Sequence, residues 1–261
     1  MIKSLIVPYS LGAKFNAKFL AIATIIVLFG FWLIAPATTG IPSPLAIIVA
    51  WDVLAKEQGL LVELLTSTYV IWQAIFLSAL ISVSIAAFYT ADILKPVSTF
   101  IASLRFLGFA GLTFLFTLWT SSAEMLKLSL LTFGMTVFLT RSTIDVVKGI
   151  PQSDIDYARS LNLNGWRLTW ELVLRGRSAD MLDLIRQNAA VGWTLLAMVE
   201  GITRSEGGIG ALLLNTNKYF KLDAVFAIQL TILIYGLLQD VALQYFRYLV
   251  CPWTRLNRSD K

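Results

Sequence analysis

Histidine is absent from this chain of 261 residues, and cysteine occurs once, at position 251. Zinc sites and histidine-based catalysis depend on the groups that are missing, and a single thiol cannot form an internal disulfide. We therefore expect no metal site, no catalytic residue and no cofactor bound by the chain itself. Cys251 is predicted to be an ordinary reduced thiol near the end of the last helix.

A phosphate-binding loop is lacking as well. No Gly-Lys pair occurs in the sequence, so the P-loop that cradles nucleotide phosphates is excluded. The glycine-rich run at residues 207–210 does not follow a strand pattern, and we interpret it as a tight turn between helices. The chain is therefore not expected to hydrolyse ATP by that route.

Charge is scarce, since 14% of the residues are charged and 57% are hydrophobic, with a mean hydropathy of +0.74. This composition predicts an all-α integral membrane protein. At about 1.5 Å per residue, roughly 20 apolar residues cross a bilayer, and six stretches of this kind occur along the chain. They lie at approximately residues 19–35, 69–91, 104–120, 125–140, 184–203 and 224–249.

The remaining organisation is that of a single transmembrane domain over residues 1–261. Residues 45–65 mix apolar and charged side chains, which predicts short amphipathic helices on the outer surface. Ser121 and Glu124 have the spacing of a capping box, so a helix is expected to start there. The first span is longer than the apolar core of a signal peptide, and we expect it to remain uncleaved.

The distribution of basic residues predicts the orientation, because Lys and Arg near a span are retained on the cytoplasmic side. With the N-terminus inside, the external segments keep only Lys56, Lys127, Arg204, Lys218 and Lys221. Both termini are then cytoplasmic. The net charge of +5 reflects this topology, and we expect no nucleic-acid partner.

The largest polar interruption is a cytoplasmic loop at about residues 142–183. Pro151 breaks the preceding helix, and Ser153, followed by two aspartates, predicts a new helix with its N-cap at Ser153. This helix is expected to end near Leu161, because residues 162–165 are types that tolerate left-handed backbone angles. A second helix follows, with an apolar stripe at Trp166, Trp170, Val173 and Leu174.

Polar residues inside spans are expensive, so each is a candidate for a transport pathway or for a helix contact. The candidates are Asn188, Trp193, Thr194 and Glu200 in the fifth span and Trp119 near the outer end of the third. For Glu200 a bond to a neighbouring helix is as reasonable as substrate contact, and the tryptophans are alternatively interface anchors. Asp240 is expected to pair with a basic residue or to lie near the inner interface.

Several short motifs, in this order and spacing, resemble the permease subunit of a bacterial ABC importer of the nitrate/sulfonate/taurine class, a binding-protein-dependent transport system inner-membrane component. The matching segments are Ile41-Pro42-Ser43-Pro44, Leu104-Arg105, Trp119, residues 154–164, 197–200, 208–210 and 223–227, Gly236 with Asp240, and Pro252-Trp253. Residues 154–164 resemble the family's cytoplasmic coupling loop.

The resemblance implies a type I importer permease that works by alternating access in the bacterial inner membrane, in contact with lipid, and carries a small polar or anionic solute. Its partners would be a second permease copy or paralogue, a substrate-binding protein, and two ATPase subunits that hold the ATP and Mg. The residues that would dock on an ATPase are Asp154, Asp156, Tyr157, Ala158, Arg159, Ser160, Leu161 and Asn162.

The coupling segment also departs from the family pattern. The family's Glu-Ala-Ala is Asp156-Tyr157-Ala158 here, its glycine falls at Asn162, and two of its prolines fall at Arg175 and near Ala179. Asn162 can still adopt a left-handed turn. The departures leave both a homodimer and a heterodimer open.

Two other function classes stay open from the residues alone. A secondary transporter or channel without an ATPase would have to bind its coupling ion through an intramembrane charge, and no inverted pair of broken hydrophobic segments is evident. The candidates for this charge are Glu200, Asp240, Glu124 and Arg186. A membrane enzyme is disfavoured by the missing histidine and by the absence of clustered carboxylates.

Overall fold

The structure, a computed structural model, describes residues 42–107, 109–203 and 207–253, together with isolated positions between residues 20 and 32. The predicted first span at 19–35 lies mostly outside the described residues. Both termini and Arg204 lie outside the described residues, so the structure does not test the side of the membrane predicted for them.

The described residues fold into helices and contain no strand. Three helices are long and apolar enough to cross a membrane: α5 (Leu60–Tyr89), α8 (Ala123–Lys148) and α13 (Leu222–Val250). A fourth span results if the bent pair of α6 and α7 is counted as one. The prediction of an all-α membrane protein is confirmed, whereas the count of six spans is not.

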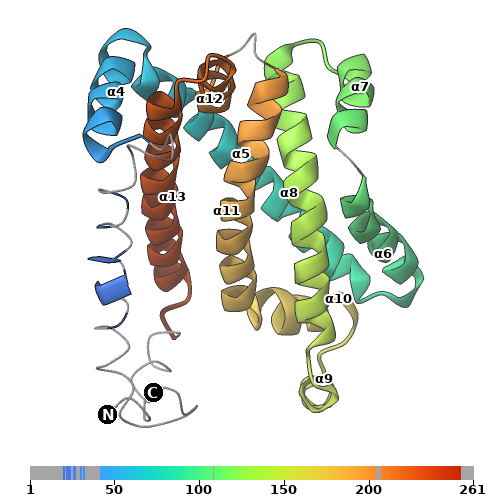
Figure 1. The fold of residues 1–261 in the computed structure, drawn as a ribbon. Helices are drawn as coiled ribbons and strands as arrows, with labels where there is room; N and C mark the ends of the chain where they lie inside the picture. The colour runs from blue at the N-terminus through green and yellow to red at the C-terminus, as the bar shows by residue number, and fades with distance from the viewer. Residues whose placement is uncertain are drawn as a thin grey trace.

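Helix α11 (Ser178–Ile202) lies between α13 and α8 in the bundle (Figure 1). It has 25 residues, which is long enough to cross a bilayer, but it is not among the three apolar helices. Arg186, Gln187 and Asn188 lower the hydropathy of its first half, and Glu200 lies close to its end. A helix of this composition is better suited to a protein or water environment than to lipid.

The chain before α5 forms a short helix, as predicted. Helix α4 (Pro44–Glu57) is capped by Ser43, whose Oγ accepts a hydrogen bond from the Ala46 N–H at 3.2 Å, and Pro44 occupies its first turn. Gly59, with a φ of 66°, makes the turn into α5. The predicted start of the next span at residue 69 was too late, because Leu60–Thr68 already belong to α5.

The predicted third span at 104–120 is wrong as one continuous helix. Helix α6 (Lys95–Ser103) passes into a 3₁₀ turn, η2 (Leu104–Phe106), and Leu107 then adopts an extended conformation. Helix α7 (Phe109–Trp119) follows after a bend of 116°. With 11 residues, α7 is about 16 Å long and cannot cross a bilayer by itself.

Helix α8 begins where a capping signal predicted a helix start, but one residue later than the predicted cap. The Ser122 hydroxyl, not that of Ser121, accepts the hydrogen bond from the Met125 N–H, at 3.2 Å. Helix α8 continues to Lys148, so the first residues of the predicted loop at 142–183 are helical.

The main hydrophobic core contains residues of α4, α5, α8, α11, α12 (Ile209–Lys218) and α13, and α5, α8 and α11 make close contacts within it. Small and hydroxyl side chains allow α5 and α8 to approach closely: Ser82 donates to the Thr136 carbonyl at 3.1 Å, and Thr140 donates to the Ser82 hydroxyl at 3.2 Å. Gly192 likewise allows α11 to approach α8 closely, because a Cβ at this position would lie 2.9 Å from the Met135 methyl carbon. These contacts hold the three helices as one packed unit.

The remaining short helices lie at the two ends of this unit (Figure 1). One end carries α9 (Gln152–Ser160), with α10 (Gly165–Leu168) and a π-helix, η3 (Thr169–Arg175), beside it. The opposite end carries α4 and α12 (Ile209–Lys218). We call these the α9 end and the α12 end.

Candidate coupling segment and polar residues of the bundle

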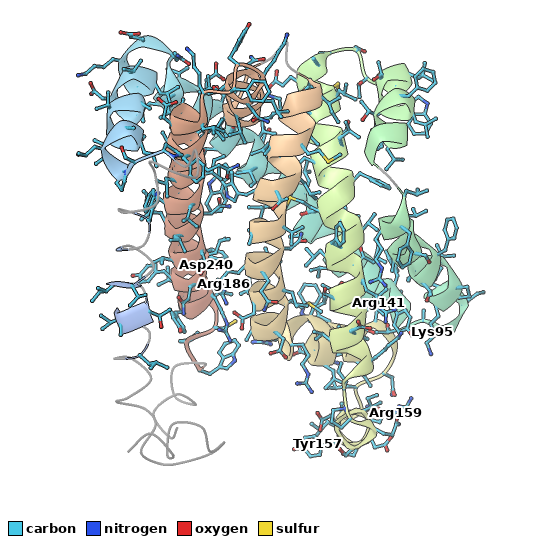
Figure 2. All side chains as sticks on the ribbon, in the orientation of Figure 1. Lys95, Arg141, Tyr157, Arg159, Arg186 and Asp240 are labelled. Carbon is cyan, nitrogen blue, oxygen red and sulfur yellow. The ribbon has the colours of Figure 1, made fainter. Side chains whose placement is uncertain are left out.

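The residues predicted to dock on an ATPase form α9 and the turn that follows it. Helix α9 lies beyond the ends of the long helices, and its labelled side chains Tyr157 and Arg159 lie at this extremity of the molecule (Figure 2). The segment is therefore accessible to a second protein over most of its surface.

The start of α9 differs from the prediction by two residues, because the N-cap is Pro151 and not Ser153. Pro151 has extended angles, with φ −61° and ψ 145°, and stands directly before the helix, which begins at Gln152. The predicted N-cap, Ser153, is therefore already inside the first turn and cannot cap it. Asp154 lies in that turn, where the helix dipole favours a carboxylate.

The end of α9 is a Schellman motif, which fixes the sharp turn. Asn162 adopts the left-handed conformation, with a φ of 61°. Its N–H donates to the Arg159 carbonyl at 2.9 Å, and the Leu163 N–H donates to the Ala158 carbonyl at 3.2 Å. The prediction that an asparagine makes this left-handed turn is confirmed.

The eight predicted docking residues fall into two groups. Ala158 is buried and Asp154 is half-buried, so these two face the rest of the molecule. The other six are exposed: Asp156, Tyr157, Arg159, Ser160, Leu161 and Asn162. Tyr157 is 68% exposed and Leu161 58%, which places two large apolar groups in the open on a short polar helix.

Three contacts join the coupling segment to the long helices. The Asp154 carboxylate lies 3.6 Å from the Arg177 guanidinium, next to the start of α11. The hydroxyls of Thr90 and Thr169 lie 2.9 Å apart, and the rings of Phe88 and Trp166 meet edge to face at 5.5 Å between centroids. The segment is therefore attached to both α5 and α11.

The predicted second helix of the loop is only partly correct. It is split into a single α-helical turn, α10, and the π-helix η3, in which the Gly176 N–H bonds to the Glu171 carbonyl at 2.9 Å. A π-helix has a wider turn, so the predicted stripe does not face one surface. Val173 is buried, whereas Trp166 and Trp170 are exposed.

Glu200, a predicted pathway residue, lies in a buried polar cluster at the α12 end. Its carboxylate accepts hydrogen bonds from the Ser67 hydroxyl at 2.6 Å and from the Gly210 N–H at 2.8 Å, and it lies 3.6 Å from the Lys127 ammonium. The cluster also takes up the glycine-rich turn. Lys127 donates to the Gly207 carbonyl at 3.1 Å.

The glycine-rich turn lies between α11 and α12, as predicted, and is held by side chains of other helices. The Gly208 N–H donates to the Glu63 carboxylate, and the Ile209 N–H donates to the Ser67 hydroxyl at 2.8 Å. Gly207 and Gly208 have φ values of 67° and 109°, backbone angles that residues with a side chain rarely adopt. The turn thus connects four helices, α5, α8, α11 and α12.

The other predicted pathway residues are not brought together. Asn188 and Trp193 are buried: Asn188 donates to the Met135 carbonyl at 3.2 Å, and the Trp193 indole donates to the Gln239 amide oxygen at 2.7 Å. Thr194 is exposed on α11. Trp119 is exposed at the end of α7.

Lys127 was predicted to lie in an outer segment, and the structure shows it buried at the α12 end of the bundle, beside Gly207. Its side chain is 1% exposed and lies within α8. The available signal for its burial was its position among apolar residues, two residues into the predicted span at 125–140, because a lysine there requires a carboxylate partner. Ser67 and Glu63 gave no comparable signal.

Asp240 pairs with a basic residue, as predicted. The Nη1 of Arg186 lies 2.8 and 2.9 Å from its two carboxylate oxygens, and both residues are labelled between α11 and α13 in Figure 2. The network continues through Asp183, which lies 3.6 Å from Arg186 and 2.9 Å from Arg247. Two positive and two negative charges therefore join α11 to α13.

The sequence is similar to those of several transport proteins. An ABC transporter permease protein of Methanocaldococcus jannaschii is 25% identical over 140 residues, covering 54% of this chain and 52% of that protein. The taurine transport system permease protein TauC of Escherichia coli is 25% identical over 139 residues, 53% and 50% of the two chains. SsuC of Escherichia coli, named as an aliphatic sulfonates transport permease, is 26% identical over 159 residues, 61% and 60% of the two chains.

The matches to these relatives thus span between one half and three fifths of their length. The match to a family profile is more extensive. The profile described as the binding-protein-dependent transport system inner membrane component covers residues 42–250, from the turn before α4 to the end of α13. The chain therefore belongs to the family of inner membrane components of binding-protein-dependent transport systems.

Proposed function

We propose that this chain is the transmembrane subunit of an ATP-driven importer and that α9 is the element on which an ATPase subunit docks. The ATPase subunits would hold the ATP and Mg, a second permease copy or paralogue would complete the pathway, and a soluble protein would deliver the solute. Residues 1–261 would form one transmembrane domain.

The exposed surface of α9 is the observation that carries the proposal. A solvated helix of nine residues with no partner gains nothing from Tyr157 and Leu161 in the open, whereas a docking helix uses such side chains as anchors. Asp156 and Arg159 flank them, with 3.7 Å between carboxylate and guanidinium. An apolar pair edged by charge is suited to binding another protein.

The attachment of α9 supports a mechanical role. A displacement of α9 would pass to α11 through Asp154 and Arg177 and to α5 through the Thr90–Thr169 contact. Because α5, α8 and α11 pack as one unit, they would rock together. This is the rigid-body movement that alternating access requires.

The uncovered face of α11 supports a pathway between two permeases. Gln187, Ala190, Val191, Thr194 and Met198 recur at helical spacing and are exposed. Polar side chains on such a face are costly against lipid, so we propose that a second permease and a polar solute face Gln187 and Thr194. Asn188, Trp193 and Glu200 would then shape the wall without touching solute, and Trp119 would lie apart from it.

The solute class follows from the relatives. Two of them are named for taurine and for aliphatic sulfonates. We propose a small anionic or zwitterionic solute of this kind. The choice among them would rest mainly with the binding protein.

A transporter or channel without an ATPase is the weaker alternative. It would need carboxylates in the membrane to bind a coupling ion, and the candidates are Glu200 and Asp240. Both are engaged in ion pairs, with Lys127 and Arg186 respectively. Charges neutralised in this way are poorly suited to bind and release an ion during each cycle.

Exchange of the two charges on α9 tests the docking role. In the Asp156→Arg/Arg159→Asp variant the pair can still form within the helix, but the pattern presented to a partner is reversed. The tagged variant is purified from its native membrane in mild detergent, and ATPase subunits are quantified by mass spectrometry. We expect at least a tenfold loss of ATPase relative to wild type.

The matched control is the Asp52→Lys/Lys56→Asp variant, which exchanges an exposed pair 2.8 Å apart on α4, at the opposite end of the molecule. This control should retain the ATPase. Wild-type recovery of ATPase by the α9 variant would contradict the docking role, and recovery of the wild-type chain alone would favour the self-contained transporter.

A further inference from the structure

Two lysines meet over one tyrosine ring at the α9 end. Tyr89 is the last residue of α5, Lys95 the first of α6 and Lys148 the last of α8. The Lys95 ammonium lies 5.9 Å from the centre of the Tyr89 ring, and the Lys148 ammonium lies 5.5 Å from it. The ends of three helices thus hold two positive charges in one small area.

The surroundings leave this area positive. Arg141 lies about two helical turns before Lys148 in α8 and is engaged with Asp145 at 3.1 Å, and Figure 2 shows Lys95 and Arg141 at this end of the bundle. Asp92 stands three residues before Lys95 in the sequence. Counted together, the three cations Lys95, Arg141 and Lys148 and the two anions Asp92 and Asp145 carry a net charge of +1. The area is suited to attract an anion.

Large apolar side chains lie in the open directly beside these charges. Ile93, Val97 and Phe100 are 85%, 54% and 65% exposed, and their spacing places them on one side of α6 and the turn before it. The opposite side of α6 packs against the bundle through the small residues Ser98 and Ala102. The exposed side therefore combines cations at its start with apolar groups along its length.

We propose that this surface, formed by Tyr89, Lys95, Lys148 and the exposed side of α6, is a binding site for an anionic phospholipid. The headgroup phosphate contacts the two ammonium groups, and an acyl chain lies along Val97 and Phe100. A soluble anion would use the lysines but would leave the apolar side chains exposed, so the lipid is the occupant that satisfies both features.

The site gives the lipid a defined place beside the coupling segment. Phe88 precedes Tyr89 and contacts Trp166 of α10 at 5.5 Å, so a headgroup at Tyr89 lies next to the joint between α5 and the segment that carries α9. Lipid bound there would restrain the end of α5. The inference does not depend on the ATPase, because it concerns this chain and the membrane alone.

Lipid binding to the purified chain in neutral detergent tests the site by native mass spectrometry. The probes are phosphatidylglycerol and phosphatidylcholine with identical acyl chains, titrated separately. We expect the first phosphatidylglycerol to bind more tightly than phosphatidylcholine. The Lys95→Gln/Lys148→Gln variant should weaken this step by about tenfold or more, since it removes both ammonium groups that contact the phosphate.

The matched control is Lys218→Gln/Lys221→Gln, which removes the same charge from two exposed lysines at the α12 end. It should keep the wild-type preference, as should the conservative Lys95→Arg/Lys148→Arg variant if a folding defect obscures the glutamine variant. An unchanged affinity in the glutamine variant, or an equal loss in the control, overturns the site. Displacement of phosphatidylglycerol by inorganic phosphate would reassign it to a soluble anion.

Discussion

At the scale of single residues, the Lys127–Glu200 pair is the most demanding feature of the chain. Both side chains are buried, and each charge loses its water on folding. The loss is offset by the 3.6 Å ion pair and by hydrogen bonds from Ser67 and Gly210 to the carboxylate. The buried pair is therefore stable only when both charges and the hydrogen-bond donors to the carboxylate are present.

Replacement of Lys127 by Met should destabilise the protein by about 3 kcal/mol, because Glu200 is left buried without its cation. For a chain of this size the melting temperature would fall by roughly 10 °C. The measurement is thermal unfolding in detergent, followed by size-exclusion chromatography. Lys56→Met, which breaks the exposed pair with Asp52, should leave the melting temperature nearly unchanged. Equal effects of the two changes would show that burial is not the cause.

The close approach of α12 to α11 gives a second residue-scale prediction. A Cβ on Gly210 would lie 2.6 Å from the Ala197 Cα and 2.7 Å from its carbonyl oxygen, and neither backbone can move without shifting its helix. Gly210→Ala should therefore destabilise by about 1–3 kcal/mol. Gly111→Ala is the matched control, since nothing lies within 4 Å of a Cβ there. A melting temperature for Gly210→Ala at or above that of Gly111→Ala would contradict this packing.

Some of these contacts were predictable from the sequence, because burying a charged side chain without a partner has a high free-energy cost. A carboxylate in an apolar helix must have a partner, so the pairing of Asp240 was predictable, and a helix bond was one of two roles considered for Glu200. Lys127 was not predictable as the partner of Glu200, because the two residues are 73 positions apart in the sequence and only the tertiary fold brings them together. Asn188, whose side chain is buried and donates to the Met135 carbonyl, shows the same limit: polarity marks a costly residue without saying which surface it faces.

At the scale of elements, the turn after α9 decides how the coupling segment is presented. Asn162 holds a φ of 61°, which asparagine and glycine accept and β-branched residues resist. The two bonds of the Schellman motif depend on that angle.

Asn162→Val should loosen this turn, whereas Asn162→Gly should preserve it. Strain of about 1–2 kcal/mol at the left-handed position would open the end of α9 without disturbing the bundle. Limited trypsin digestion measures the effect, because Arg159 and Arg167 flank the turn. Faster cleavage at these two sites in Asn162→Val alone, with an unchanged melting temperature, is the expected result. Similar digestion rates in all three proteins would mean that the angle does not control the segment.

Elements with strong local signals were predicted well, and elements set by long-range packing were not. The proline before α9 and the asparagine after it predicted the ends of that helix to within two residues. The break between α6 and α7 was not predicted, because residues 106–120 carry no charge and are mostly apolar, and composition does not distinguish one long helix from two short ones. The π-helix was not predicted either, since an extra residue in a turn leaves the helical spacing of Trp166 and Trp170 in the sequence unchanged.

At the scale of the whole molecule, the two ends of the bundle differ in the way they are held. At the α12 end, buried side chains of α5, α8 and α11 clamp the glycine-rich turn. At the α9 end the attachments are the partly exposed ion pair of Arg177 with Asp154, one hydroxyl contact and one contact between aromatic rings. Helix α9 itself lies beyond the ends of the long helices. Movement is therefore expected at the α9 end, with the α12 end following as a unit.

The proposed orientation places these ends on opposite sides of the membrane, which thiol labelling can test. A Cys251→Ser background removes the native thiol, itself buried, and Tyr157→Cys and Lys218→Cys then place one exposed thiol at each end. In right-side-out vesicles a membrane-impermeant maleimide should label position 218 and leave 157 unlabelled, and inverted vesicles should give the reverse. Labelling of both positions from one side would contradict a bundle that spans the membrane. Reversed labelling would keep the span but place α9 outside, where no ATP-driven subunit could reach it, so the ATPase proposal would fail while the fold remained.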